Sequence, residues 1–124
     1  MSNILERLQE FDFIRKSLED KESRWPFKMF GVECDSGWDE LIYNLCKDLK
    51  EMGFDGQVLQ IKEKYGTLRY YISGGSNQIY ARIDIAEEES GKTCEICSKP
   101  GKVRDQRFWR KCVCDEHKGE AIWE

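Results

Sequence analysis

This chain of 124 residues has little of what enzymes and membrane proteins depend on. It contains one histidine, and neither a Ser/His/Asp set nor a Gly-rich phosphate loop is visible, which leaves few candidates for acid–base or phosphoryl-transfer chemistry. No apolar run approaches the roughly 20 residues that cross a bilayer, and the N-terminus has no apolar leader. We therefore expect a cytoplasmic protein that is not an enzyme and has no membrane partner.

An excess of positive charge is missing as well. The net charge is −4 and there is no basic tail, which argues against nucleic-acid binding through a strongly positive surface. The charge is uneven, because residues 57–72 carry three basic and one acidic side chains, and residues 92–124 carry eight basic and six acidic ones. Such positive regions can concentrate an anionic ligand locally, but ordinary solvated surface charge has the same pattern.

The most specific motif is a pair of metal-ligand couples in the last third of the chain. Cys94 and Cys97 form a CxxC couple, and Cys114 and His117 form a CxxH couple after sixteen intervening residues. Four Cys or His ligands close a tetrahedral zinc site and leave no position for water, as in structural zinc centres. The sequence therefore predicts Zn²⁺ as a structural cofactor, in preference to three disulfides or to reduced thiols near a histidine.

Cys112 is a competing ligand for that metal. It lies two residues before Cys114, and the alternation of a strand places both side chains on the same side. We choose Cys114 because its spacing from His117 matches that of the CxxC couple, and we expect Cys112 to be a neighbouring free thiol.

The surroundings of the couples resemble a treble-clef or zinc-ribbon-like module over residues 92–124. Short strands are predicted at Val103 and over 107–113, followed by a helix over 115–123. The module also carries a group of cations that offers a nucleic-acid surface: Lys99, Lys102, Arg104, Arg107, Arg110 and Lys111.

Upstream, the hydrophobic periodicity predicts an α+β fold, with helices packed on a β-hairpin or small antiparallel sheet. Helices are predicted over 4–21, 38–52 and 77–90, and strands over 57–65 and 67–72. We divide the chain into an N-terminal amphipathic helix (1–24), an α-β-β-α core (25–91) and the zinc-binding module (92–124).

The hairpin register follows from a two-residue turn at Tyr65 and Gly66. Three outward cross-strand pairs are then predicted: Lys64 with Thr67, Lys62 with Arg69, and Gln60 with Tyr71. Like charges opposite each other destabilise a strand pair, so something should offset the contact between Lys62 and Arg69. These two side chains either reach into water or lie against the acidic residues 87–89. Alternatively, they hold an anionic ligand together with Lys64 and Tyr71.

The inward side of the same hairpin pairs Leu59 with Ile72 and includes one carboxylate, Glu63. Buried alone, Glu63 would be costly, so we expect it to have a cationic or hydrogen-bonding partner. Trp38 and Trp109 have two interpretations, as core residues or as stacking platforms for a base.

Four stretches of the sequence resemble a family of small uncharacterised proteins of phages and prophages. They are residues 33–42 (ECDSGWDELI), residues 60–71 (QIKEKYGTLRYY), residues 86–97 (AEEESGKTCEIC), and Trp109 with Cys114 and His117. The resemblance covers about residues 30–117. Threonine is frequent in that family at the position of Cys112, which favours Cys114 as the ligand. The family implies a phage setting but no established activity.

Three functions remain open at this stage. The first is a binding protein that sequesters a nucleotide signal of host defence, with Lys62, Lys64 and Arg69 on phosphates and Tyr71 or Trp38 on a base. The second is a nucleic-acid-binding regulator that uses the cations of the zinc module. The third is an inhibitor that docks on a host protein. A homodimer in which two hairpins share one anion is a further expectation.

Overall fold

In the computed structural model, the described residues are 3–105 and 110–118. The elements in chain order are α1 (Ile4–Leu8), α2 (Asp12–Glu19), α3 (Pro26–Phe30), β1 (Val32–Glu33), the 3₁₀ turn η1 (Ser36–Trp38), α4 (Asp39–Glu51), β2 (Gln57–Lys64), β3 (Thr67–Ser73), α5 (Asn77–Ser90), β4 (Lys102–Asp105) and β5 (Arg110–Val113).

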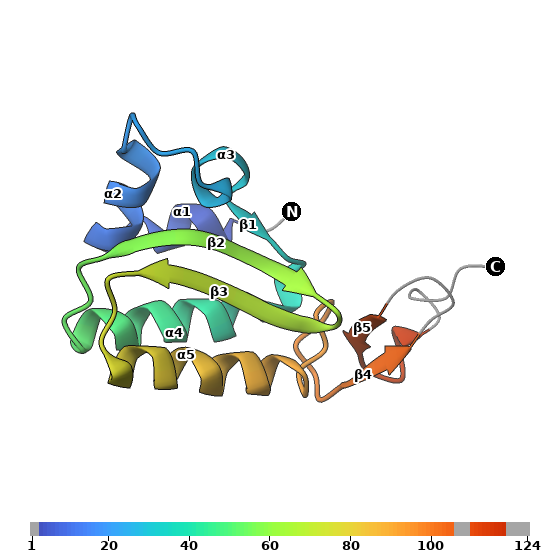
Figure 1. The fold of residues 1–124 in the computed structure, drawn as a ribbon. Helices are drawn as coiled ribbons and strands as arrows, with labels where there is room; N and C mark the ends of the chain where they lie inside the picture. Colours follow the sequence, from blue (N-terminus) through green and yellow to red (C-terminus); the bar gives the residue numbers. More distant parts are fainter. Residues whose placement is uncertain (1–2, 106–109, 119–124) are drawn as a thin grey trace.

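The architecture is α+β, as predicted, with helices against a small sheet and a C-terminal hairpin (Figure 1). The sheet has the order β1-β2-β3, and it is mixed because β1 runs parallel to β2 while β2 and β3 are antiparallel. Strand β1 is missing from the prediction, since two residues are too few to show a periodic pattern. Among the described residues, no helix has both the length and the apolar character needed to cross a membrane.

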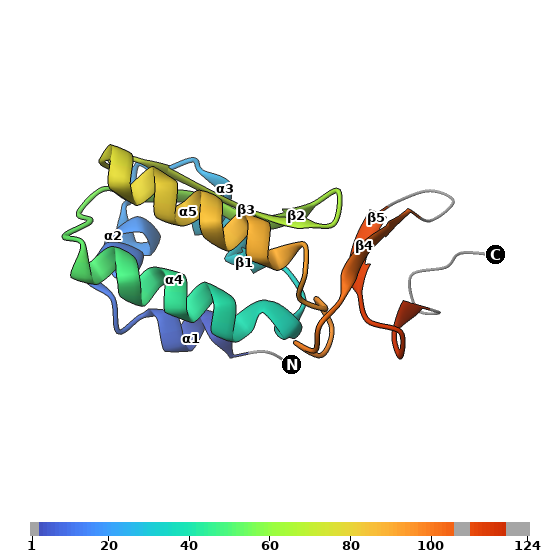
Figure 2. The same ribbon diagram turned by 90° about the horizontal axis from the view of Figure 1, so that it is seen from below.

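The helices gather on one face of the sheet and along its edges. Helix α5 packs on β3 and on α4, α1 packs on α4, and α2 and α3 pack on β2. Seen from below, α1 and α4 lie on the same side of the strands (Figure 2). Figure 1 looks onto the opposite face, which no described helix crosses. This outer face of the sheet is therefore open.

The single helix predicted over 4–21 is wrong, because the structure has two helices there. Between α1 and α2, Phe11 adopts an extended backbone with φ −93° and ψ 127°. Phe11 and Phe13 are both buried, and their rings stack with centroids 5.9 Å apart. In a continuous helix these residues would point about 200° apart and could not both face the core. The break allows both rings to be buried.

Helices α4 and α5 agree with the prediction and supply much of the core. Ile42, Leu45 and Leu49 of α4 are fully buried, whereas Met52 is 41% exposed beyond the helix end. Ser76 caps α5, and its Oγ accepts a hydrogen bond from the Ile79 N–H at 3.2 Å.

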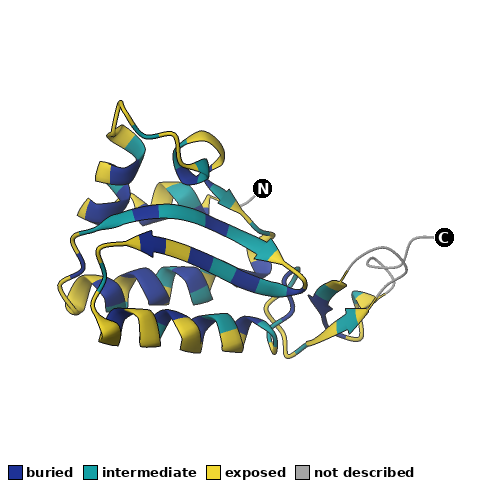
Figure 3. Ribbon diagram, viewed as in Figure 1, coloured by how far each residue is buried: buried dark blue, intermediate teal, exposed yellow. Residues whose placement is uncertain are grey.

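The predicted hairpin register is confirmed for the three outward pairs, Lys64–Thr67, Lys62–Arg69 and Gln60–Tyr71. Tyr65 and Gly66 have φ of 54° and 87°, as a two-residue hairpin turn requires. The pairing of Leu59 with Ile72 is wrong, because the register shifts between Val58 and Gln60 and Val58 takes that position. One extra residue at a β-bulge changes which side chains face inward from there on. Figure 3 shows buried residues alternating with more exposed ones along β3.

Side chains from the helices accept hydrogen bonds from N–H groups of β3 and β2 that face no neighbouring strand. On the β3 edge, the Leu68 N–H donates to Ser90 Oγ at 2.7 Å, and the Tyr70 N–H donates to Glu87 Oε2 at 2.9 Å. On β2, in the part that the short β1 does not reach, the Val58 N–H donates to Ser17 Oγ at 2.9 Å. Free edge groups would invite pairing with another chain. These strand groups are thus satisfied while the outer face stays accessible.

In the C-terminal part, β4 and β5 form an antiparallel hairpin in place of the predicted strands at Val103 and over 107–113. Residues 115–117 form a turn. Arg107, Trp109 and residues 119–123 of the predicted C-terminal helix lie outside the described residues.

Candidate functional site

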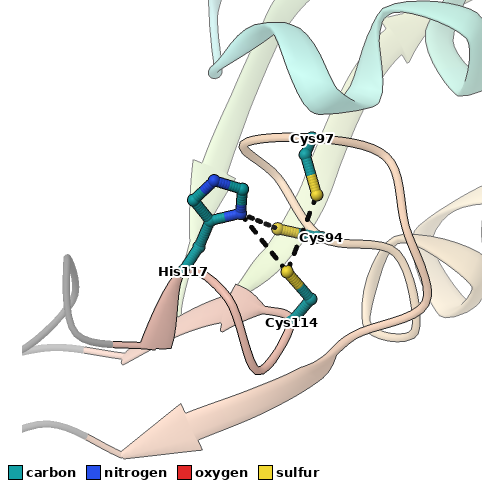
Figure 4. Close-up of side chains that lie close together, drawn as sticks. All are labelled: Cys94, Cys97, Cys114 and His117. Carbon is teal, nitrogen blue, oxygen red and sulfur yellow. Dashed lines mark hydrogen bonds between the residues drawn. The ribbon is translucent and has the colours of Figure 1, made fainter.

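The four predicted metal ligands meet at one point (Figure 4). Their ligand atoms all lie within 4.8 Å of one another. Cys97 Sγ is 3.6 Å from Cys114 Sγ, and the Nδ1 atom of His117 is 3.3 Å from Cys114 Sγ and 3.7 Å from Cys94 Sγ. A tetrahedral zinc ion with bonds of about 2.3 Å to sulfur places its sulfur ligands about 3.8 Å apart. The cluster could hold a metal ion such as zinc, with His117 Nδ1 as the nitrogen ligand.

Two tight turns present these ligands. In the first, the Cys94 N–H donates to the Lys99 carbonyl at 2.8 Å and the Ser98 N–H donates to the Cys94 carbonyl at 3.0 Å, with Ser98 in a left-handed conformation at φ 73°. In the second, which follows β5, the His117 N–H donates to the Cys114 carbonyl at 3.2 Å. Each turn returns the chain after two residues, so both ligands of a couple point to the same side.

Hydrogen bonds favour the thiolate form of one ligand, Cys94. Burial raises the pKa of the Cys94 thiol, but hydrogen bonds from the backbone N–H groups of Cys114, Cys97 and Ile96 outweigh it and bring the pKa to about 7. Zinc binds the thiolate and not the thiol. With three thiols and one imidazole, all four tetrahedral positions are taken by protein atoms.

Cys112 is outside this cluster. Its side chain is fully buried in the main hydrophobic core, and burial raises the pKa of its thiol to about 11. Strand β5 ends at Val113, so Cys114 lies beyond the strand and is free of the alternation that would put it beside Cys112. The structure thus places Cys114, and not Cys112, with the other three predicted ligands.

The first ligand turn is joined to the start of α4 by close backbone contacts. The Gly37 N–H donates to the Glu95 carbonyl at 2.7 Å, and Ser98 Oγ donates to the Gly37 carbonyl. Trp38 Nε1 donates to the Thr93 carbonyl at 2.8 Å. A Cβ on residue 37 would lie 2.3 Å from the Glu95 carbonyl carbon and oxygen, so only glycine fits. The metal module is therefore anchored to the core.

This arrangement corrects one predicted site residue. Trp38 is fully buried and packs in the main core, so its ring has no face for a ligand. The interpretation of Trp38 as a stacking platform is wrong, and the alternative, a core residue, is confirmed.

A buried charged group next to the metal cluster escaped the sequence reasoning. Glu95 is 3% exposed, its Oε2 accepts a hydrogen bond from the Asp35 N–H at 2.9 Å, and its Oε1 lies 3.7 Å from Lys111 Nζ. Lys111 Nζ also lies 2.6 Å from Asp35 Oδ2. Burial raises the pKa of Glu95 and, with the surrounding carboxylates, that of the Cys34 thiol. Contacts between residues 35, 95 and 111 are long-range, and no local pattern could reveal them.

The four other predicted ligand-binding residues come together on the outer face of the sheet. Lys62 and Arg69 are direct cross-strand neighbours, and Lys64 and Tyr71 occupy the adjacent outward positions. Lys62 and Arg69 are half-buried, Lys64 is exposed, and Tyr71 is 42% exposed. Among the described residues, none of the three cations forms an ion pair within 4.0 Å.

The acidic run at residues 87–89 is therefore not the partner of this cluster. The Glu87 carboxylate accepts a hydrogen bond from the Tyr70 N–H. The charge of Arg69 acts on this carboxylate from a distance and forms no ion pair with it. Arg69 Nε is buried and has no hydrogen-bond partner within residues 3–105 and 110–118. On the other side of Lys62 lies Glu33 of β1, whose carboxylate accepts a hydrogen bond from Gln60 at 3.1 Å.

Glu63 has the hydrogen-bonding partner that we expected for it. Its Oε2 accepts a hydrogen bond from the Gly66 N–H at 2.7 Å, and the side chain is half-buried. The carboxylate thus fastens the hairpin turn, a structural role.

The cations of the zinc module differ from those of the sheet face because carboxylates neutralise most of those described. The pairs are Lys99 with Glu116, Arg104 with Asp115, Arg110 with Asp105, and Lys111 with Asp35 and Glu95. Such pairing reduces the positive field that a nucleic acid would meet.

Comparisons of the chain with protein-family models, curated proteins and solved structures found no match.

Proposed function

We propose that this protein is a non-enzymatic binding protein, in which a structural zinc ion holds the C-terminal module and the outer sheet face binds an anionic, nucleotide-type ligand. Lys62, Lys64 and Arg69 contact phosphate oxygens, and Tyr71 offers its ring to a base. The observation that carries the proposal is the cross-strand pair of Lys62 and Arg69, two like charges side by side without an ion-pair partner among the described residues.

An anion at this position removes an unfavourable feature of the free protein. Like charges directly opposite each other on a strand pair cost a few tenths of a kcal/mol or more. Arg69 Nε is buried and finds no partner in the described part of the chain, so it too favours an added hydrogen-bond acceptor. A phosphate that accepts hydrogen bonds from both side chains offsets the repulsion and satisfies charged donors.

The proposed role of zinc is structural, because the Cys94, Cys97, Cys114 and His117 side chains fill a tetrahedron and leave no place for substrate or water. Binding of the metal is then coupled to folding of the module. No step of chemistry is assigned to it.

The resemblance to phage proteins suggests the setting. In an infected cell, a small protein that sequesters a nucleotide signal would counteract host defence without any turnover, and we propose this role. Nucleic-acid binding through the zinc module is the weaker alternative because most of its described cations are paired. Inhibition of a host protein remains a second alternative, for which a pull-down is the test.

The experiment is calorimetric titration of the zinc-loaded protein with ATP, a dinucleotide and a cyclic dinucleotide, together with mass spectrometry of anything released on heating. Binding should vanish in Lys62→Ala/Arg69→Ala, while zinc content and the circular dichroism spectrum stay unchanged. The matched control is Lys47→Ala, which removes an exposed cation from α4, behind the sheet. Absence of binding by every nucleotide, or binding that survives the double substitution, would contradict the proposal.

A further inference from the structure

The outer sheet face has aromatic rings at both ends of its row of cations. Along the hairpin, the order is Tyr65 at the turn, Lys64, then Lys62 beside Arg69, then Tyr71. Tyr65 is 63% exposed and Tyr71 is 42% exposed, so both rings are accessible. Lys64 Nζ lies 5.4 Å from the centre of the Tyr65 ring, which places that ring beside the cations.

The spacing of this row suits a chain of nucleotides better than one nucleotide. Outward residues on a strand lie about 7 Å apart, so the row from Lys64 to Gln60 extends about 14 Å. The cations of this row lie between the two rings. Single-stranded nucleic acids are bound by such a combination, in which cations follow the backbone and aromatic side chains stack on successive bases.

The open outer face also favours a chain of nucleotides over a single nucleotide. Small-molecule sites are usually concave and cover most of their ligand. Here no described helix crosses the outer face (Figure 1), and the charged residues belong to the paired strands β2 and β3. An extended strand can lie along the whole of such a surface, whereas a single nucleotide would contact only part of the row.

We infer that the outer sheet face binds single-stranded nucleic acid, with Lys62, Lys64 and Arg69 on the backbone and Tyr71 and Tyr65 stacked on bases. This inference rests on the proposed anion-binding face and names its ligand. A duplex is a poorer ligand, because its bases are already stacked and cannot lie on the rings.

Glu33 offers a further test of binding at this face. Its carboxylate is in register with Lys62 on β1 and belongs to the same row. A strand of phosphates passing over Lys62 must approach this carboxylate, so Glu33→Gln should tighten binding. A purely structural role of the row predicts no change. The hydrogen bond from Gln60 can be kept by the amide oxygen of the substituted side chain.

The test is fluorescence anisotropy of a labelled oligothymidylate of about 12 nucleotides, compared with the same sequence as a duplex and with ATP. Three backbone contacts predict a slope of log K against log salt of about −2 between about 50 and 200 mM salt, falling to about −0.7 in Lys62→Ala/Arg69→Ala. Tyr71→Ala should weaken binding about tenfold. Tyr71→Phe, which keeps the ring, should leave it unchanged.

Each outcome bears on a different claim. If ATP binds through Lys62 and Arg69 but the oligonucleotide binds no more tightly, the inference is wrong and the proposed function stands. If neither binds, both are wrong. If the oligonucleotide binds and the substitutions at Lys62, Arg69 and Tyr71 have no effect, its site lies elsewhere and both assignments of the sheet face fail. A duplex that binds as well as the single strand overturns the inference alone.

Discussion

Replacement of Gly37 by alanine should separate the zinc module from the core. The added Cβ would lie 2.3 Å from the carbonyl carbon and oxygen of Glu95 and 2.4 Å from the Cys94 carbonyl oxygen, where contact needs about 3.5 Å. All three atoms are backbone, so no side-chain rotation relieves the overlap. The ligand turn must move away from the start of α4.

That movement breaks a defined set of hydrogen bonds. They are Gly37 N–H to the Glu95 carbonyl, Trp38 Nε1 to the Thr93 carbonyl and Ser98 Oγ to the Gly37 carbonyl. At about 1 kcal/mol each, their loss lowers the free energy of unfolding by about 3 kcal/mol. If the module stays in place instead, the retained overlap costs about 1–3 kcal/mol.

The assay is urea unfolding of the zinc-loaded protein, followed by tryptophan fluorescence, with zinc content measured by a chelating dye. Gly53→Ala is the control, because Gly53 has φ +83° and no atom within 4 Å of an added Cβ. That change carries only the cost of a left-handed backbone, about 1 kcal/mol. An effect of Gly37→Ala no larger than that of Gly53→Ala would refute the anchoring of the module through Gly37.

Three further predictions concern single side chains. Burial raises the pKa of Glu87, and the hydrogen bond from the Tyr70 N–H offsets this only in part, so the folded state favours the protonated carboxyl. The resulting contribution to the free energy of unfolding is present below the unfolded pKa of 4.5. It is lost as pH rises through the pKa of the folded state. Glu87→Gln should therefore match or exceed the wild-type urea midpoint at pH 7 and lose that advantage near pH 4; a lower midpoint at pH 7 would contradict this. Ser90→Ala should lower the unfolding free energy by about 2 kcal/mol, measured in the same titration, because it leaves a buried N–H of β3 unpaired. Cys112→Ser should keep one zinc per chain and Cys114→Ser should lose it, as metal analysis of the purified variants will show; zinc loss from the first variant alone would reverse the ligand assignment.

The local parts of this structure could be predicted from the sequence because their signals are local. In the CxxC couple that ends at Cys97 and the CxxH couple that ends at His117, two residues separate the ligands, and this spacing is visible in the sequence. The hairpin register follows from the turn at Gly66, whose φ of 87° glycine adopts without strain. Helices α4 and α5 are long enough for their apolar periodicity to be clear.

The predictions that were wrong concern features that depend on contacts between distant segments. Phe11 and Phe13 are both drawn into the core and break a helix that periodicity alone would continue. Trp38 is buried, and its indole N–H donates a hydrogen bond to the carbonyl of Thr93, 55 residues away. The bulge after Val58 shifts one end of the hairpin, and no residue type marks it in the sequence.

The most direct test of the account is an NMR titration of the zinc-loaded, isotope-labelled protein with a nucleotide or oligonucleotide that binds it. If the outer sheet face is the binding site, shift changes should be confined to Lys62, Lys64, Arg69 and Tyr71 and their surroundings, with the signals of the zinc ligands unmoved. Changes centred on Cys94 and His117, or spread over the cations of the zinc module, would contradict it.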